Sequence, residues 1–135
     1  PERLDWLSLL AWHRCLCPDP AIRDTAKAVA HARDFARDFD RGQNVLGICL
    51  CENGDYGEAR EELERCLADP SPLHRGWSEK ASRLYLALAY RKLGMPDRAA
   101  AELRDARARP TEDGPIDWWG VMALQRVEAL LADRP

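Results

Sequence analysis

The feature that most restricts the fold is an internal repeat. The stretch from Gly47 to Pro70 recurs at a constant offset of 40 residues, which takes Gly54 to Gly94. The matched positions are small or apolar residues, a turn glycine and a closing proline, and they pair Leu46 with Leu86, Gly47 with Ala87, Ile48 with Leu88, Leu50 with Tyr90, Gly54 with Gly94, Ala59 with Ala99, Leu63 with Leu103, Cys66 with Ala106 and Pro70 with Pro110. Self-similarity at a fixed period is typical of arrays whose units bury their apolar faces against one another. We therefore expect stacked copies of one small unit.

Each unit is predicted to be two antiparallel helices joined by a tight turn. Gly54 allows the first helix to end, because glycine has no Cβ penalty at positive φ. Asp55 is a good N-cap for the second helix, and Glu58 follows three residues later, as in a capping box. In that second helix the apolar residues recur at three- and four-residue steps, which places them on one face: Tyr56, Ala59, Leu63, Cys66 and Leu67.

The rest of the chain extends the array at both ends. Cys17-Pro18-Asp19-Pro20 breaks an N-terminal helix, and Ala28 and Ala32 lie four apart on the next helix, which predicts a divergent first repeat. Pro115 fits the first position of a last helix, which we expect to cover the apolar face of the final hairpin. The chain is thus predicted to be one all-α domain, 1–135, with repeats at about 3–39, 41–70 and 78–110 and a capping helix at about 115–133.

This pattern resembles the tetratricopeptide repeat, which has a period of about 34 residues. The family has a small residue where the first helix crosses the second and an alanine in the second helix, as at Ala87 and Ala99. The surplus of about six residues falls in a loop from Ser71 to Ser78 that can absorb it. The resemblance implies a right-handed superhelical array of three helix hairpins, a solenoid whose concave face binds partners.

A narrower resemblance covers nearly the whole chain. The segments that carry it are Leu10-Ala11-Trp12, Cys17-Pro18-Asp19-Pro20, Arg23-Asp24, Ala28-Val29, Leu84-Tyr85-Leu86-Ala87 and Arg91-Lys92-Leu93-Gly94. They are similar to a repeat module that follows serine/threonine kinase or beta-propeller domains in planctomycete proteins. This resemblance implies an appended interaction or regulatory module, and no catalytic residues carry over from it.

The composition limits the classes of function. Apolar residues make up 46% and charged residues 32% of the chain, the net charge is −3, and acidic and basic residues are interleaved. We therefore expect neither a nucleic-acid partner nor a membrane partner. Five cysteines, an odd number, in a chain able to form a core favour a reducing compartment and a cytoplasmic location. Because the sequence begins at Pro1 rather than Met, we expect it to be part of a longer protein or a processed product.

Residues able to hold a metal or perform catalysis are present but poorly placed. Cys49 and Cys51 lie two apart in a predicted helix, so their side chains diverge by roughly 200° and do not grip one zinc ion. In the alternative, Cys15, Cys17 and a residue of the next repeat form the ligand set of a metal or redox switch. The three histidines have no neighbouring nucleophile at a spacing that would form a dyad. We therefore predict no enzyme activity, no metal site and no cofactor.

The predicted binding surface is the concave face, lined by the first helix of each repeat. Mapping the repeat places these candidates there: Trp12, Arg41, Asn44, Ile48, Glu52, Leu84, Arg91 and Lys92. Trp12 would anchor a partner, and Arg91 with Lys92 would contact a carboxylate or an acidic peptide. In the alternative, Trp12 is a core residue and the charges form a solvated surface.

Two functions of different class follow from this surface. The first is a non-catalytic interaction or scaffolding module that binds a peptide, a helix or a neighbouring domain of the same longer chain, with an open groove and an exposed Trp12 or Leu84. The second is a structural spacer or self-association module, in which the terminal helix or a second copy of the chain fills the groove.

Overall fold

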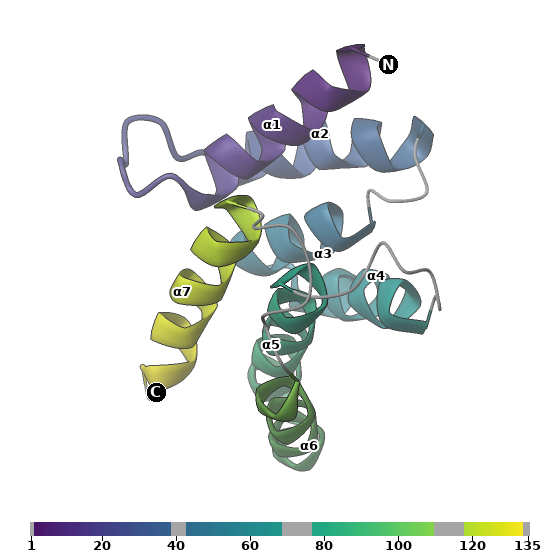
Figure 1. Ribbon diagram of the computed structural model, residues 1–135, viewed down its shortest axis with the longest axis vertical. Coiled ribbons are helices and arrows are strands. Elements are labelled where there is room, and N and C mark those ends of the chain that lie inside the picture. The colour runs from purple at the N-terminus through teal and green to yellow at the C-terminus, as the bar shows by residue number, and fades with distance from the viewer. Residues whose placement is uncertain (1, 39–42, 69–76, 110–117, 134–135) are drawn as a thin grey trace.

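The computed structural model describes residues 2–38, 43–68, 77–109 and 118–133. Within these ranges every regular element is an α-helix, which confirms the predicted all-α class (Figure 1). The helices are α1 (Glu2–Leu16), α2 (Thr25–Asp38), α3 (Gln43–Glu52), α4 (Tyr56–Ala68), α5 (Trp77–Lys92), α6 (Pro96–Ala108) and α7 (Trp118–Ala132).

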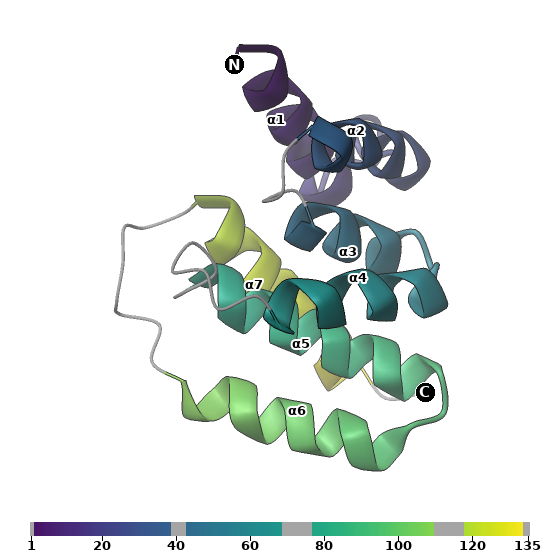
Figure 2. The ribbon, with the colours of Figure 1, turned by 90° about the vertical axis from the view of Figure 1, so that its right-hand side faces the viewer.

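The first six helices pair in sequence order. α1 packs on α2, α3 on α4 and α5 on α6, and Figure 2 shows the three hairpins stacked one against the next. α3 also contacts both α1 and α5, so these three first helices form an inner layer, and α2, α4 and α6 form an outer layer. The right-handed superhelix implied by the resemblance stays a prediction.

Two hairpin turns have the same geometry. Gly54 and Gly94 adopt positive φ angles of 85° and 75°. Each turn is closed by a backbone hydrogen bond of 2.8 Å, from Asp55 N–H to the Leu50 carbonyl and from Met95 N–H to the Tyr90 carbonyl. Together with the bond made by each glycine N–H, this is a Schellman motif, which satisfies the last carbonyls of a helix and favours glycine at its left-handed position. The predicted role of the two glycines is confirmed.

The hairpin cores are built where small residues let the helices cross. Gly47 of α3 lies against Leu63 of α4, whose side chain is fully buried. Ala87 occupies the equivalent position of α5 and is also fully buried. The predicted inner face of α4 is confirmed by the burial of Ala59, Leu63 and Cys66.

The last helix, α7, lies along the inner layer. It packs mainly on α5 of the last hairpin and also contacts α1 at the other end of the array (Figure 1). Its buried residues recur at helical spacing along one face: Gly120, Ala123, Leu124, Val127 and Leu131. α7 therefore closes over the face on which the groove candidates were placed.

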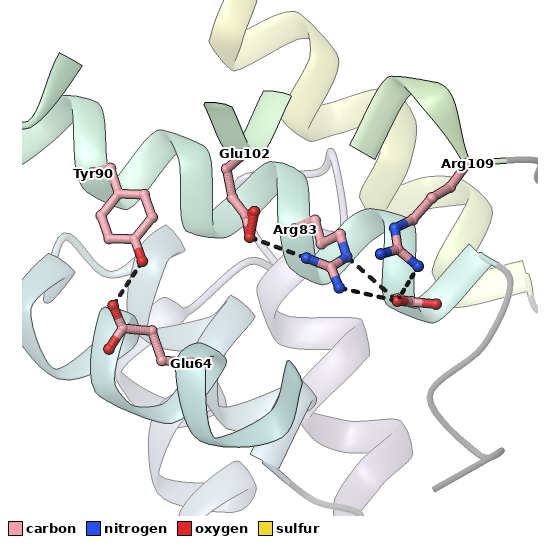
Figure 3. Close-up of polar contacts among 6 residues, drawn as sticks. Glu64, Arg83, Tyr90, Glu102 and Arg109 are labelled. Atoms are coloured by element: carbon pink, nitrogen blue, oxygen red, sulfur yellow. Dashed lines mark hydrogen bonds and ion pairs between the residues drawn. The ribbon is translucent and has the colours of Figure 1, made fainter. Parts of the chain in front are cut away.

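Charged side chains connect the helices of the last two hairpins (Figure 3). Arg83 of α5 is 14% exposed, and its guanidinium lies 3.2 Å from Glu79 on the same helix and 3.1 Å from Glu102 of α6. The Tyr90 hydroxyl donates to Glu64 of α4 at 2.7 Å. Burial raises the pKa of the Glu102 carboxyl, against the opposing effect of Arg83.

Replacing Arg83 with alanine is expected to lower the free energy of unfolding by roughly 1–2 kcal/mol near pH 7, because two half-buried carboxylates lose their common partner. The pKa of Glu102 is already raised in the folded state, so the folded state binds its proton more tightly than the unfolded state does. Acidification through that raised pKa therefore favours folding, and the loss should shrink towards about pH 5. Urea denaturation at the two pH values measures this. Adding Glu102→Gln to Arg83→Ala should remove most of the pH dependence, and a dependence that persists would contradict the assignment.

Candidate functional site

Glu52, the last residue of α3, is the centre of the charged cluster on the inner face. Its carboxylate is 3% exposed and accepts from Arg23 Nη2 at 3.2 Å, from the Tyr85 hydroxyl at 3.1 Å and from Arg126 Nε. We call these four residues the Glu52 cluster. A carboxylate at the C-terminal end of a helix is unfavourable on its own. Two guanidiniums and a hydroxyl compensate this one.

The four residues come from different parts of the chain. Arg23 lies in the loop between α1 and α2, where its Nε also donates to the Cys15 carbonyl at 3.2 Å. Tyr85 belongs to α5, and Arg126 belongs to α7. The single carboxylate of Glu52 therefore connects all three hairpins and the last helix.

The environment favours one protonation state for each of two members of the cluster, Arg126 and Tyr85. Hydrogen bonding to Glu52 raises the pKa of the Arg126 guanidinium, which stays charged. Burial raises the pKa of the Tyr85 hydroxyl well above its usual value, and the neighbouring Glu52 charge adds to the effect. Tyr85 is thus a neutral donor throughout the physiological range. Both oxygens of Glu52 accept from the donors of the cluster, and its carboxylate is their common acceptor.

A cavity of about 240 Å³ adjoins the cluster between the inner layer and α7. Its charged lining consists of three cations and two carboxylates: Arg23, Lys92, Arg126, Glu52 and Asp133. Lys92 is exposed, and within the described ranges its ammonium forms no ion pair. Beside it, Arg91 Nη1 donates to the Leu131 carbonyl at the end of α7 at 2.8 Å.

Three of the predicted groove residues are core residues. Trp12, Ile48 and Leu84 are all buried. The expectation that an open groove exposes Trp12 or Leu84 is wrong, because the inner-layer helices pack on the outer layer, on one another and, in the case of α1 and α5, on α7. The alternative, in which Trp12 belongs to the core, is confirmed.

The other candidates have different positions. Glu52 and Lys92 line the cavity, and Arg91 binds the end of α7. Asn44 is half-buried near the start of α3, and Arg41 lies outside the described residues. The role of this set in binding a partner stays a prediction.

Three members of the Glu52 cluster were missed in the sequence. Arg23 and Tyr85 occur in the sequence analysis only within segments that carry the family resemblance, and Arg126 is not among its candidates. Their partner Glu52 is 29, 33 and 74 residues away, respectively. No local spacing connects them, since they meet only after the hairpins have stacked and α7 has folded back.

The cysteines are packed between helices. Cys49 Sγ points to the Ala11 carbonyl of α1 at 3.9 Å, whereas Cys51 Sγ points to the Tyr85 carbonyl of α5 at 3.5 Å, which confirms that the two side chains diverge. A hydrogen bond with Cys49, followed by burial, raises the pKa of the Cys15 thiol, and burial raises that of Cys51. Among the described residues, no group of three or more His, Cys, Asp or Glu side chains is arranged to hold a metal ion.

Comparison with known proteins identifies one repeat. Residues 81–110, which begin within α5 and extend just past α6, match the family model of the tetratricopeptide repeat. No curated protein and no solved structure matches the chain. In the parts of the chain that the structure describes, no helix has the length and apolar character needed to cross a membrane.

Proposed function

We propose that this chain, which contains a tetratricopeptide repeat, is a non-catalytic protein-interaction or scaffolding module that binds its partner on the inner face around Glu52. Tetratricopeptide repeats generally mediate protein–protein interaction, and the partner is a protein or peptide, which includes a neighbouring domain of the same chain. The candidate contacts are Glu52, Arg91 and Lys92. Two more are Asn44, near the start of α3, and Arg41, which precedes α3 in the sequence.

The observation that carries the proposal is that charged side chains on this face remain partly exposed to solvent. Arg23 and Arg126 are 30% and 31% exposed, so solvent and partners reach the Glu52 cluster from the side. Lys92 adds a further cation at the edge of the same cavity. Partly exposed charges around a buried acceptor provide specificity for a complementary surface.

The structural-spacer alternative has an observation in its favour. α7 covers the inner layer, and this is the arrangement which that alternative predicts. The interaction module and the structural spacer differ in whether a partner protein touches the inner face. A contact-mapping experiment on the full chain therefore separates them.

A photocrosslinking amino acid at position 92 should form an adduct with a partner protein in extracts of the source cells, because Lys92 is exposed at the edge of the cavity. The matched control is the same amino acid at Arg104, an exposed residue on α6 of the outer layer. Adducts identified by mass spectrometry at position 92 and not at 104 support the proposal. Adducts only at 104 would assign binding to the outer face, and adducts at neither position would favour the structural spacer.

A further inference from the structure

We propose that the inner face binds, in trans, an amphipathic helix that carries an arginine in the place of Arg126, and that α7 is a built-in competitor for this site. This inference rests on the proposed function, since it names the partner and the regulation of the same face. The contacts of α7 define the features that such a helix must have.

The apolar contacts define the register of the helix. α7 buries Ala123, Leu124, Val127 and Leu131 against the inner layer, whereas Gln125 is exposed. Ala123 and Leu124 lie three and two residues before Arg126, and Val127 and Leu131 lie one and five residues after it. These steps follow one face of a helix of 3.6 residues per turn.

Two polar contacts define its direction and its end. Arg126 binds the buried Glu52 carboxylate. A carboxylate accepts a guanidinium better than an ammonium because the donors of the guanidinium lie in one plane. Arg91 donates to the Leu131 carbonyl, one of the last carbonyls of α7, which have no partner within the helix. Lys92 lies beside the same end, where the helix dipole favours a cation. The face therefore fits a helix that ends about two turns after its arginine.

The packing of α7 leaves space beside the helix. The cavity of about 240 Å³ separates part of α7 from the inner layer. An open groove of about 740 Å³ also adjoins α7 near the end of α1, and Leu16 and Met122 form part of its lining. Apolar atoms beside a void lose dispersion contacts that a filled interface would provide. A helix with larger side chains at these positions would gain those contacts and displace α7.

The first turn of α7 contacts α1. The half-buried ring of Trp119 meets His13 of α1 edge-on, with 6.4 Å between ring centroids, and His13 is exposed. A competing helix would have to replace this contact as well.

The test uses a labelled peptide with the sequence of residues 118–133, titrated into the 135-residue chain and followed by fluorescence polarisation. In the Arg126→Ala chain the peptide keeps its arginine while the competing helix has lost it. We expect the peptide to bind this variant about tenfold or more tightly than it binds the wild-type chain. The ratio follows because α7 of the variant has lost its charge-assisted hydrogen bond to the buried Glu52 carboxylate and competes less well. The Arg104→Ala chain, which loses an exposed arginine of α6, should bind the peptide as the wild type does.

The outcomes separate the two proposals. Equal binding to the wild type and Arg126→Ala would overturn the competitor role of α7 and leave the inner face as a binding surface. Binding to neither chain, with the helical circular dichroism of both intact, would overturn the proposed use of that face. A peptide with the R126E change should bind neither chain, and its binding as tightly as the wild-type peptide would contradict recognition by Glu52. If Arg126→Ala fails to fold, hydrogen exchange in the wild-type chain decides the question: α7 amides should exchange faster than those of α5, and equal protection would overturn the inference.

Discussion

Replacing Gly47 with valine is expected to lower the free energy of unfolding by about 3 kcal/mol, at the upper end of the usual cost of overpacking a core. A Cβ at this position would lie 2.6 Å from both Cγ and Cδ2 of Leu63. Leu63 is fully buried, so it has no free space into which to move. The helices α3 and α4 would have to separate, and the contacts along their crossing would be lost.

Urea denaturation of two matched variants measures the effect. Gly57→Ala on α4 adds a Cβ that meets nothing within 4 Å, so it should stabilise the chain by roughly 0.5–1 kcal/mol through helix propensity alone. Gly47→Ala should fall between the two changes, because the same gain in propensity offsets part of the clash. A Gly47→Val variant as stable as the wild type would show that the crossing of α3 and α4 is wider than described.

Replacing Glu52 with glutamine should lower the free energy of unfolding by about 2 kcal/mol, the second largest effect we expect. The change keeps the size of the side chain but leaves Arg23 and Arg126 close together without a counter-charge. Their partial exposure, near 30% for each, reduces the penalty below that of a fully buried pair. The loss should be largest at low salt, since the remaining repulsion between the guanidiniums is then least screened.

Glu58→Gln is the matched control. Glu58 also pairs with an arginine, Arg33 of α2, but both side chains are exposed, at 40% and 46%. Removing an exposed pair of this kind costs less than about 1 kcal/mol. Thermal or urea denaturation that gave equal losses for Glu52→Gln and Glu58→Gln would contradict the structural importance of the Glu52 cluster. In an Arg126→Ala background, the effect of Glu52→Gln should become smaller, because one of the two repelling charges is gone.

The parts of the fold that depend on local chemistry were predictable. Helix ends at Gly54 and Gly94 follow from a backbone conformation that glycine favours. Asp24 precedes the second helix, and its carboxylate accepts the Lys27 N–H at 3.0 Å, as the side chain of an N-cap does. In the last helix, Ala123 and Val127 lie four residues apart on one face, and both are fully buried. Each of these features is decided within a few residues along the chain.

The candidate site depends on contacts that no local pattern encodes. A periodic stripe indicates which side of a helix is apolar, but it does not say whether another helix will cover that side. The sequence therefore places Trp12 and Leu84 in a groove, and it leaves open whether the terminal helix fills that groove, as α7 does beside α1 and α5. Arg126 illustrates the same limit, because its guanidinium reaches Glu52 only through the packing of α7 on the inner layer.

The junction at Glu52 also affects how the array folds. In most repeat proteins each unit touches only its neighbours, so that the ends can fray while the middle stays folded. Here one carboxylate joins Arg23 of the first hairpin to Tyr85 of the third, and α7 contacts both α1 and α5. Unfolding of the first hairpin would therefore remove contacts from the third, and unfolding of the third would remove contacts from the first. Such connectivity joins the two terminal hairpins through Glu52, a link that is absent from a row of units that touch only their neighbours.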